Sequence, residues 1–121
     1  MKVLIVDDSN SMRSIERSIL LEMNMQTFEA ANGEEAIDLL RAMGSFDLIL
    51  LDINMPKLNG LQTLKKIKMC KKYKDIPVIM CTTCKSKEHV SVALKLGARN
   101  YIVKPFDSES FVRKVEQVIN L

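Results

Sequence analysis

Carboxylates, a hydroxyl group and an ammonium group directly follow four of the short apolar runs in this sequence. Asp7 and Asp8 follow VLIV, Asp52 follows LILL, Thr82 follows VIMC and Lys104 follows YIV. A single aspartate in such a place often only caps a helix or forms a turn, because its side chain accepts hydrogen bonds from nearby backbone amides. The coincidence of all five groups instead predicts one charged site, assembled from segments that are far apart along the chain.

Three carboxylates held within a few ångströms of one another need either protons or a cation. Each close pair repels by roughly 4 kcal/mol at an effective dielectric constant near 20. Magnesium prefers oxygen ligands, keeps several waters and binds through one or two carboxylates together with phosphate oxygens. The residue types therefore predict Mg²⁺ as the cofactor, with Asp8 and Asp52 as direct ligands.

Asp52 is the predicted nucleophile of this site. A carboxylate can attack phosphorus, while a metal ion and Lys104 neutralise charge on the transferred group and Thr82 donates a hydrogen bond to it. The product is an aspartyl phosphate, which adds about 1.5 to 2 negative charges by analogy with other phosphorylated side chains. We expect this charge to reposition nearby hydrogen-bond donors.

The elements that must position these groups alternate between short apolar runs and longer amphipathic segments. The runs predict five strands, over Lys2–Val6, Gln26–Ala30, Asp47–Leu51, Ile76–Cys81 and Asn100–Val103. Apolar residues at helical spacing predict five helices between and after them, with Asn32-Gly33 and Ser108 at two helix starts and Gly97 at one helix end. This alternation is typical of an α/β fold with a parallel sheet, where ligands bind beyond the carboxyl ends of the strands.

Length and composition limit the class of protein. The 121 residues are 47% hydrophobic and 27% charged, which is typical of one globular domain, here residues 1–121. No apolar run approaches the roughly 20 residues that span a bilayer, and MKVLIV has no cleavage signal, so we expect a cytoplasmic protein without membrane insertion. The three cysteines are expected to be reduced thiols, and the net charge of +3 does not by itself indicate nucleic-acid binding.

Taken together, the motifs resemble the receiver domains of two-component response regulators, over essentially the whole chain. VLIVDDS, LILLDINMPKLNG, Thr82 and GARNYIVKPF occur in the family's order, with Thr82 and Lys104 at the family's spacing from Asp52. The resemblance implies a flavodoxin-like, doubly wound (βα)5 sandwich, with a five-stranded parallel sheet in the order 2-1-3-4-5.

The resemblance also implies a role for each charged residue. Asp52 matches the phosphoacceptor, and Lys104 matches the lysine that binds the phosphoryl group. Asp7, Asp8 and Asp52 match the carboxylates of the magnesium site, which Asn54 completes through its backbone carbonyl. The Lys104-Pro105 peptide bond matches a cis bond of the family.

A second set of matches concerns the response to phosphorylation. Thr82 and Tyr101 match the family's switch pair, in which the threonine moves toward the phosphoryl group and the aromatic ring turns inward. Asn54 and Cys84 occupy positions that tune dephosphorylation in the family. The implied partner-binding face comprises Lys87, Val90, Tyr101, Val103, Phe106 and Lys114.

These residues predict a phosphoacceptor signalling switch that catalyses only its own phosphorylation and dephosphorylation. A sensor histidine kinase or acetyl phosphate would supply the phosphoryl group. The DDSNSMR opening and the absence of an output domain resemble stand-alone chemotaxis regulators, which implies a monomer acting on the flagellar motor switch. A single-domain phosphorelay intermediate, and a receiver fragment of a longer DNA-binding regulator, remain as alternatives.

Other functions fit the sequence less well. A flavodoxin-like cofactor binder needs phosphate donors where this chain has Asp7-Asp8. A haloacid-dehalogenase-like phosphatase has a second aspartate where this chain has Asn54, which cannot shuttle a proton. The lysines between Lys65 and Lys74 leave nucleic-acid binding as an alternative, although such a cluster is more often a solvated helix face.

The cysteines and the single histidine do not predict a metal site. Cys81 and Cys84 form a C-x-x-C motif, but zinc needs four ligands and only Cys70 and His89 remain, on different predicted helices. We therefore interpret His89 as a helix-surface residue.

Overall fold

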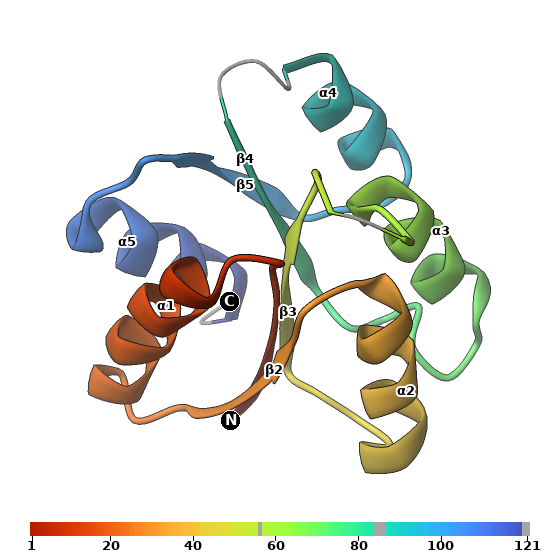
Figure 1. Cartoon of the computed structure of the whole chain (residues 1–121), viewed down its shortest axis with the longest axis horizontal. Helices are drawn as coiled ribbons and strands as arrows, with labels where there is room; N and C mark the ends of the chain where they lie inside the picture. Colours follow the sequence, from red (N-terminus) through yellow and green to blue (C-terminus); the bar gives the residue numbers. More distant parts are fainter. Residues whose placement is uncertain (56, 84–86, 120–121) are drawn as a thin grey trace.

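The computed structural model places five strands in one parallel sheet with five helices around it, within the residues that the structure describes, which are 1–55, 57–83 and 87–119 (Figure 1). The strands are β1 (Lys2–Val6), β2 (Gln26–Ala30), β3 (Leu48–Asp52), β4 (Val78–Thr83) and β5 (Asn100–Lys104). The helices are α1 (Asn10–Glu22), α2 (Gly33–Met43), α3 (Gly60–Met69), α4 (Lys87–Lys95) and α5 (Ser108–Ile119). The strand order β2-β1-β3-β4-β5 confirms the order that the resemblance implied.

Two separate apolar layers fill the space between the sheet and the helices. α1 and α5 cover one face of the sheet, with Leu20 and Phe111 in the core. α2, α3 and α4 cover the other face, where Leu40 and Leu64 are buried. Every residue of β3 is buried, as expected for a central parallel strand covered on both faces.

The ends of three strands differ slightly from the prediction. β3 lies one residue later than predicted, so Asp52 is its last residue, and β5 is one residue longer and includes Lys104. β4 includes both Thr82 and Thr83. Parallel pairing continues to the carboxyl ends of these strands, with Asp52 opposite Cys81 and Thr83 opposite Lys104. The backbone hydrogen bonds of the sheet therefore fix the positions of Asp52, Thr82 and Lys104.

The beginning of β4 also differs, because it lies two residues later than predicted. Pro77 has no N–H to donate to a neighbouring strand, and its carbonyl accepts a hydrogen bond of 3.0 Å from the amide of Ile49. The paired ladder therefore begins with Val78 opposite Ile49. Ile76 lies before the strand, and its apolar side chain is buried in the core.

Local signals explain where the helices begin and end. The side chains of Ser9, Asn32 and Asn59 accept a backbone hydrogen bond at the starts of α1, α2 and α3. Asp107, one residue before the predicted Ser108, accepts from the amide of Ser110 at the start of α5. Beyond α4, Gly97 has a φ of 111°, a conformation that glycine adopts readily, in agreement with the predicted helix end.

Two further features complete the fold. The Lys104–Pro105 peptide bond is cis, as the resemblance implied. None of the described helices is long and apolar enough to cross a membrane.

Candidate functional site

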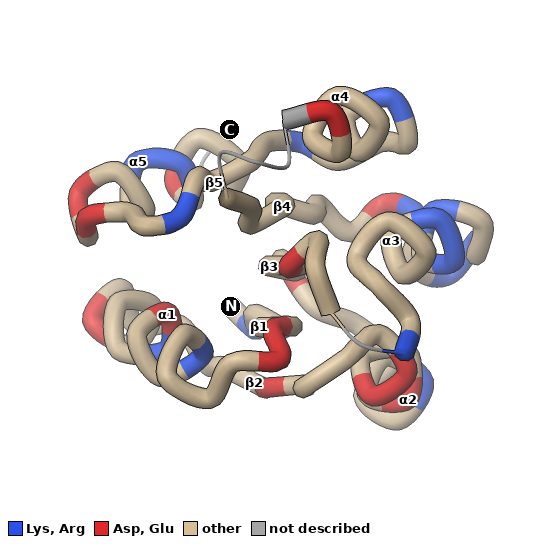
Figure 2. The backbone as a smooth tube through the Cα atoms, turned by 45° about the horizontal axis from the view of Figure 1, so that its top comes forward, with Lys and Arg blue, Asp and Glu red and all other residues tan. Residues whose placement is uncertain are grey.

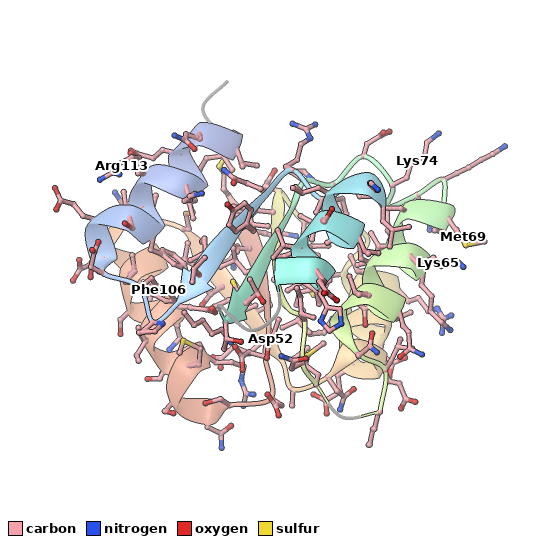
Figure 3. The ribbon with its side chains drawn as sticks, turned by 90° about the horizontal axis from the view of Figure 1, so that it is seen from above. Asp52, Lys65, Met69, Lys74, Phe106 and Arg113 are labelled. Carbon is pink, nitrogen blue, oxygen red and sulfur yellow. The ribbon has the colours of Figure 1, made fainter. Side chains whose placement is uncertain are left out.

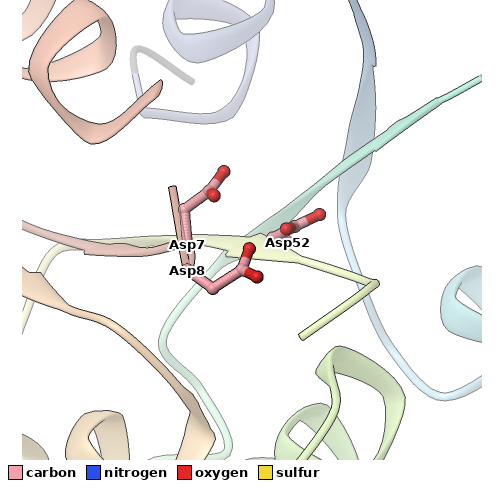
Figure 4. Close-up of side chains that lie close together, drawn as sticks. All are labelled: Asp7, Asp8 and Asp52. Carbon is pink, nitrogen blue, oxygen red and sulfur yellow. The ribbon is translucent and has the colours of Figure 1, made fainter. Parts of the chain in front are cut away.

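Three carboxylates meet at the carboxyl ends of β1 and β3. Asp7 and Asp8 follow β1 directly and Asp52 ends β3, and these two strands are paired, with Val6 opposite Leu51. One oxygen from each carboxylate lies within 4.8 Å of the others, and Figure 4 shows the three side chains gathered at this edge. Asp7 and Asp52 are buried, whereas Asp8 is exposed.

Lys104 reaches this cluster from the far side of β4. Its Nζ lies 2.7 Å from Oδ2 of Asp7 and 3.3 Å from Oδ1 of Asp52. Burial alone would lower the pKa of Lys104, but the hydrogen bond to Asp7 and the charges of Asp52 and Asp7 outweigh it and raise the pKa. Lys104 is therefore a cation at neutral pH, placed between the two buried carboxylates.

Asp52 has an unusually high proton affinity for an aspartate. The pKa of its carboxyl group is raised to about 6, mainly by burial and also by the charge of Asp7, whereas Lys104 and the Asn54 backbone amide oppose the shift. At pH 7 most molecules carry the ionised carboxylate that a nucleophile requires. A bound cation favours that form still more, because an opposite charge nearby lowers the pKa of a carboxyl group.

The donor set fits a hard divalent cation such as Mg²⁺. Three carboxylates and one ammonium group leave an excess of negative charge, and all of the candidate ligand atoms are oxygens. Both oxygens of Asp7 already accept hydrogen bonds, from the Ser9 amide at 2.9 Å and from Lys104. Asp8 faces solvent and lines, with Asn54, a cavity of about 380 Å³, so it is well placed to contact a hydrated ion.

The predicted switch residues line a second cavity. Thr82 on β4 and Tyr101 on β5 both line this space of about 470 Å³ between β4, β5 and α4. The Thr82 side chain is almost fully buried, and its hydroxyl donates a hydrogen bond of 3.2 Å to the carbonyl of Thr83. The hydroxyl group is thus engaged with its own strand in this structure.

The predicted partner-binding residues fall into two groups. Lys114 stacks over Tyr101 at 4.6 Å from the ring centroid, and a cavity of about 360 Å³ is lined by both of them together with Val103 and Phe106. Val90, which is 8% exposed and belongs to the core cluster, lines the cavity of about 470 Å³ together with Thr82 and Tyr101. Lys87, the remaining member, begins α4, and its side chain lies outside the described residues.

The cysteines do not form a thiolate site in the described part of the chain. Cys81 is a buried residue of β4, and burial raises the pKa of its thiol well above the usual range. A thiol in this state lacks the thiolate that zinc binding and redox exchange require. Cys84, the other half of the C-x-x-C motif, lies outside the described residues.

Two residues near the site were not assigned to it from the sequence. Glu16 of α1 is 1% exposed, and its Oε1 has no hydrogen-bond partner among the described residues. Burial, followed by the charge of Asp7, raises the pKa of Glu16 to about 8. A sequence signal existed, since Glu16 lies four residues after Met12 and three before Ile19, on the apolar face of the helix. His89 is exposed, as expected, and lines the cavity that contains Asp8.

A glycine brings α3 against the end of β3. The amide of Gly60 donates a hydrogen bond of 2.9 Å to the carbonyl of Ile53. A Cβ atom on Gly60 would lie 2.1 Å from the carbonyl oxygen of Asp52, which is closer than any side chain permits. This close approach sets the position of the backbone that carries Asp52.

Fold and site together define a receiver domain, with an acidic cluster and a lysine at the carboxyl edge of a five-stranded parallel sheet. Residues 3–116 match the response regulator receiver domain family, and the chain belongs to this family of two-component signalling proteins. The resemblance stated from the sequence is thus confirmed.

The chain is similar over nearly its full length to chemotaxis proteins. It is 44% identical over 120 residues to a chemotaxis protein CheY homolog of Campylobacter jejuni, covering 98% of this chain and 92% of the relative. It is 42% identical to chemotaxis protein CheY1 of Helicobacter pylori, covering 98% and 97%. The structure of CheY4 from Vibrio cholerae superimposes with a TM-score of 0.89 at 35% identity, covering 97% of both chains.

Proposed function

We propose that this protein is a phosphoacceptor switch of a chemotaxis pathway, phosphorylated on Asp52 in a Mg²⁺-dependent reaction. The observation that carries the proposal is the position of Asp52, whose buried carboxylate lies 3.3 Å from a lysine and beside two further aspartates. The CheY relatives, which match almost their whole length, support the chemotaxis assignment.

The reaction transfers a phosphoryl group to an oxygen of Asp52. The carboxylate attacks phosphorus as the bond from phosphorus to the donor breaks, which is the P–N bond of a kinase phosphohistidine or the P–O bond of acetyl phosphate. The donor leaves with the electron pair of that bond, as imidazole after protonation or as acetate. Asp7, Asp8, Asp52 and the Asn54 carbonyl would hold Mg²⁺, which would supply positive charge to the phosphoryl oxygens.

The side chains around Asp52 have separate roles in this proposal. Lys104 is already within reach of the Asp52 oxygen and pairs with the new phosphoryl oxygens. Asp7 holds Lys104 by a hydrogen bond of 2.7 Å before the reaction. Because the phosphoryl group adds negative charge, it competes with Asp7 for the ammonium group.

Phosphorylation then shifts an equilibrium between two conformations. Thr82 must exchange its bond to the Thr83 carbonyl for one to the phosphoryl group, and it lines the same cavity as Tyr101. Movement of either side chain alters the face formed by α4, β5 and α5, on which Val103 and Lys114 lie. This face would bind the flagellar motor switch protein as its output partner.

We further propose that residues 1–121 act as a single cytoplasmic domain and as a monomer. The similarity to CheY1 across 97% of that relative supports the single-domain part of this proposal. A receiver domain within a longer regulator is the second candidate, since the chain matches 26% of the NtrX structure from Brucella abortus at 27% identity and a TM-score of 0.91.

Incubation with acetyl phosphate and MgCl₂ tests the phosphoacceptor assignment directly. Mass spectrometry should detect one added phosphoryl group on the wild-type protein, and none when EDTA is present during the reaction to remove Mg²⁺. The Asp52→Asn variant should remain unmodified, because an amide cannot replace the carboxylate nucleophile. An unmodified wild-type protein, or an Asp52→Asn variant that is modified to the same extent, would contradict the proposal.

A further inference from the structure

A cluster of exposed lysines lies at the C-terminal end of α3 and on the turn that follows it. We call this cluster the basic surface, and it comprises Lys65, Lys66, Met69, Lys71, Lys72 and Lys74, all of them exposed. Residues 65–75 contain six lysines and one aspartate, a local charge of +5, in a chain whose net charge is +3. The rest of the chain therefore has a net charge of −2, and Figure 2 shows the blue segments concentrated on and after α3.

The basic surface is held in place by the one lysine of the segment that points inward. Lys68 donates hydrogen bonds from Nζ to the carbonyl oxygens of Lys74 and Ile76, at 2.9 and 3.1 Å. Tyr73 and Ile76 are buried beneath the turn, and the amide of Lys74 donates to the carbonyl of Cys70 at 2.8 Å. The turn that presents the lysines is thus fixed before any partner arrives, which lowers the entropic cost of binding.

An apolar side chain lies within this basic surface. Met69 is 76% exposed and follows Lys65 by one helical turn, so the two side chains share a face of α3. Within the part of the chain that the structure describes, the five exposed lysines form no salt bridge with an acidic residue. Such like charges repel one another, so the arrangement does not serve the stability of the isolated fold.

The chemistry of the surface favours an acidic protein segment over a nucleic acid. Residues 65–75 contain no arginine, and their one aromatic residue, Tyr73, is 7% exposed. This segment therefore supplies neither the bidentate guanidinium groups nor the stacking platform that nucleic-acid sites commonly use, and the one arginine whose charge acts on Lys68 is Arg99, just before β5. Met69 instead offers a flexible apolar contact of the kind found in protein-binding surfaces.

We propose that the basic surface is a second docking site, which binds an acidic segment of a partner protein containing an apolar residue. It lies apart from the proposed output face, since Figure 3 shows Lys65, Met69 and Lys74 on one side of the molecule and Phe106 and Arg113 on the other. The turn that carries Lys71, Lys72 and Lys74 precedes β4, whereas Asp52 lies at the carboxyl edge of the sheet. Binding at this surface is therefore independent of phosphorylation on Asp52.

A labelled synthetic peptide that repeats Glu-Glu-Leu serves as the probe, and fluorescence anisotropy at low salt measures its affinity. The double variant Lys65→Glu/Lys72→Glu should bind the peptide at least about tenfold more weakly, as the loss of two exposed ion pairs implies. Met69→Ser should weaken binding about threefold through the lost apolar contact. Acetyl phosphate and Asp52→Asn should leave the affinity unchanged.

A matched control variant carries the same change in net charge at two positions outside the basic surface. Arg41 on α2 and Arg113 on α5 are both exposed, and Arg41→Glu/Arg113→Glu should bind the peptide nearly as well as the wild-type protein. Equal weakening in this control would show a general effect of net charge and overturn the proposal. Tighter binding of a DNA duplex than of the peptide, with the same dependence on Lys65 and Lys72, would also overturn it in favour of a nucleic-acid site. Circular dichroism confirms that each variant is folded, and phosphorylation by acetyl phosphate does so for the variants that keep Asp52.

Discussion

Asp7, Asp52 and Lys104 form a charged group that is largely removed from water, so the state of each side chain depends on the others. The Lys104 ammonium group lowers the pKa of Asp52, and Asp52 in turn helps to raise the pKa of Lys104. Removal of the ammonium group leaves two buried carboxylates facing each other, without the cation that separates them.

Replacement of Lys104 by alanine should therefore raise the pKa of Asp52 above its value of about 6. Carbon-detected NMR titration of the Asp52 carboxyl group, in metal-free protein, measures this shift. We expect the variant to retain some phosphorylation by acetyl phosphate but to switch poorly, because no ammonium group links the phosphoryl group to β5. Arg41→Ala is the control, and normal phosphorylation-dependent binding of a partner by Lys104→Ala would contradict the proposed coupling.

Glu16 is a buried carboxylic acid beside this group, and it makes stability depend on pH. Its pKa is about 8 in the folded protein, against an ordinary value of 4.5. Between these values the unfolded chain loses the proton while the folded protein keeps it. The free energy of unfolding therefore falls as the pH rises from 4.5 to 8, by up to about 1.4 kcal/mol per pH unit, and this loss is absent below the window.

Glu16→Gln should remove this dependence and stabilise the protein at pH 7 by about 1–3 kcal/mol. Urea denaturation at several pH values measures the difference between variant and wild type, which should shrink toward pH 5. The comparison isolates Glu16, because Asp52 contributes a similar loss of stability between its ordinary pKa and about 6 in both proteins. The Glu22→Gln substitution, at an exposed position on the same helix, should have little effect on the free energy of unfolding. Parallel pH–stability curves for Glu16→Gln and wild type would contradict the raised pKa of Glu16 in the folded protein.

At the scale of the elements, the position of the site depends on how α3 meets β3. Gly60 begins α3, and the space for a Cβ atom at this position is taken by the backbone of Asp52 and Ile53. A capping box between Asn59 and Gln62 fixes the first turn of the helix just at this contact. The start of α3 and the end of β3 therefore cannot shift independently.

Gly60→Ala should destabilise the protein by about 1–3 kcal/mol and slow phosphorylation of Asp52, because the added methyl group displaces the backbone that carries the nucleophile. Gly44→Ala is a useful comparison. Gly44 has a φ of 84° with open space around it, and it precedes β3 at the opposite end from Asp52. Its replacement should also reduce stability, through backbone strain, but leave the phosphorylation rate unchanged. Equal rates for both variants would show that the contact does not position Asp52.

At the scale of the whole molecule, charge of opposite sign is concentrated at two separate places. Carboxylates gather at the carboxyl edge of β1 and β3, and lysines gather around the end of α3. The parallel sheet causes the first concentration, since all of its strands end at the same edge. The second follows from a single continuous segment, 65–75. The proposed output face and the proposed docking surface thus lie at separate places on one domain.

Much of this arrangement could be predicted from the sequence because parallel strands impose a strict geometry. Any residue that ends an apolar run lies at one edge, so Asp7, Asp8, Asp52 and Lys104 had to approach one another once the runs were taken as strands. The strand bounds themselves were predicted to within two residues. The remaining differences follow from local hydrogen bonding, as at Pro77, which periodicity does not reveal.

Other features depend on contacts between elements that no local pattern contains. The periodicity of α1 places Glu16 on an apolar face, but only the packing of that face beside Asp7, Cys81 and Lys104 makes it a buried acid.

By itself, then, the sequence determined the strands, the family and the residues of the acidic site. The tertiary structure alone decided which charges lie in water and which face one another in the core. Side-chain type and spacing set what a residue can do, whereas the pKa of an ionisable group depends on solvent and neighbouring charges that the fold brings together.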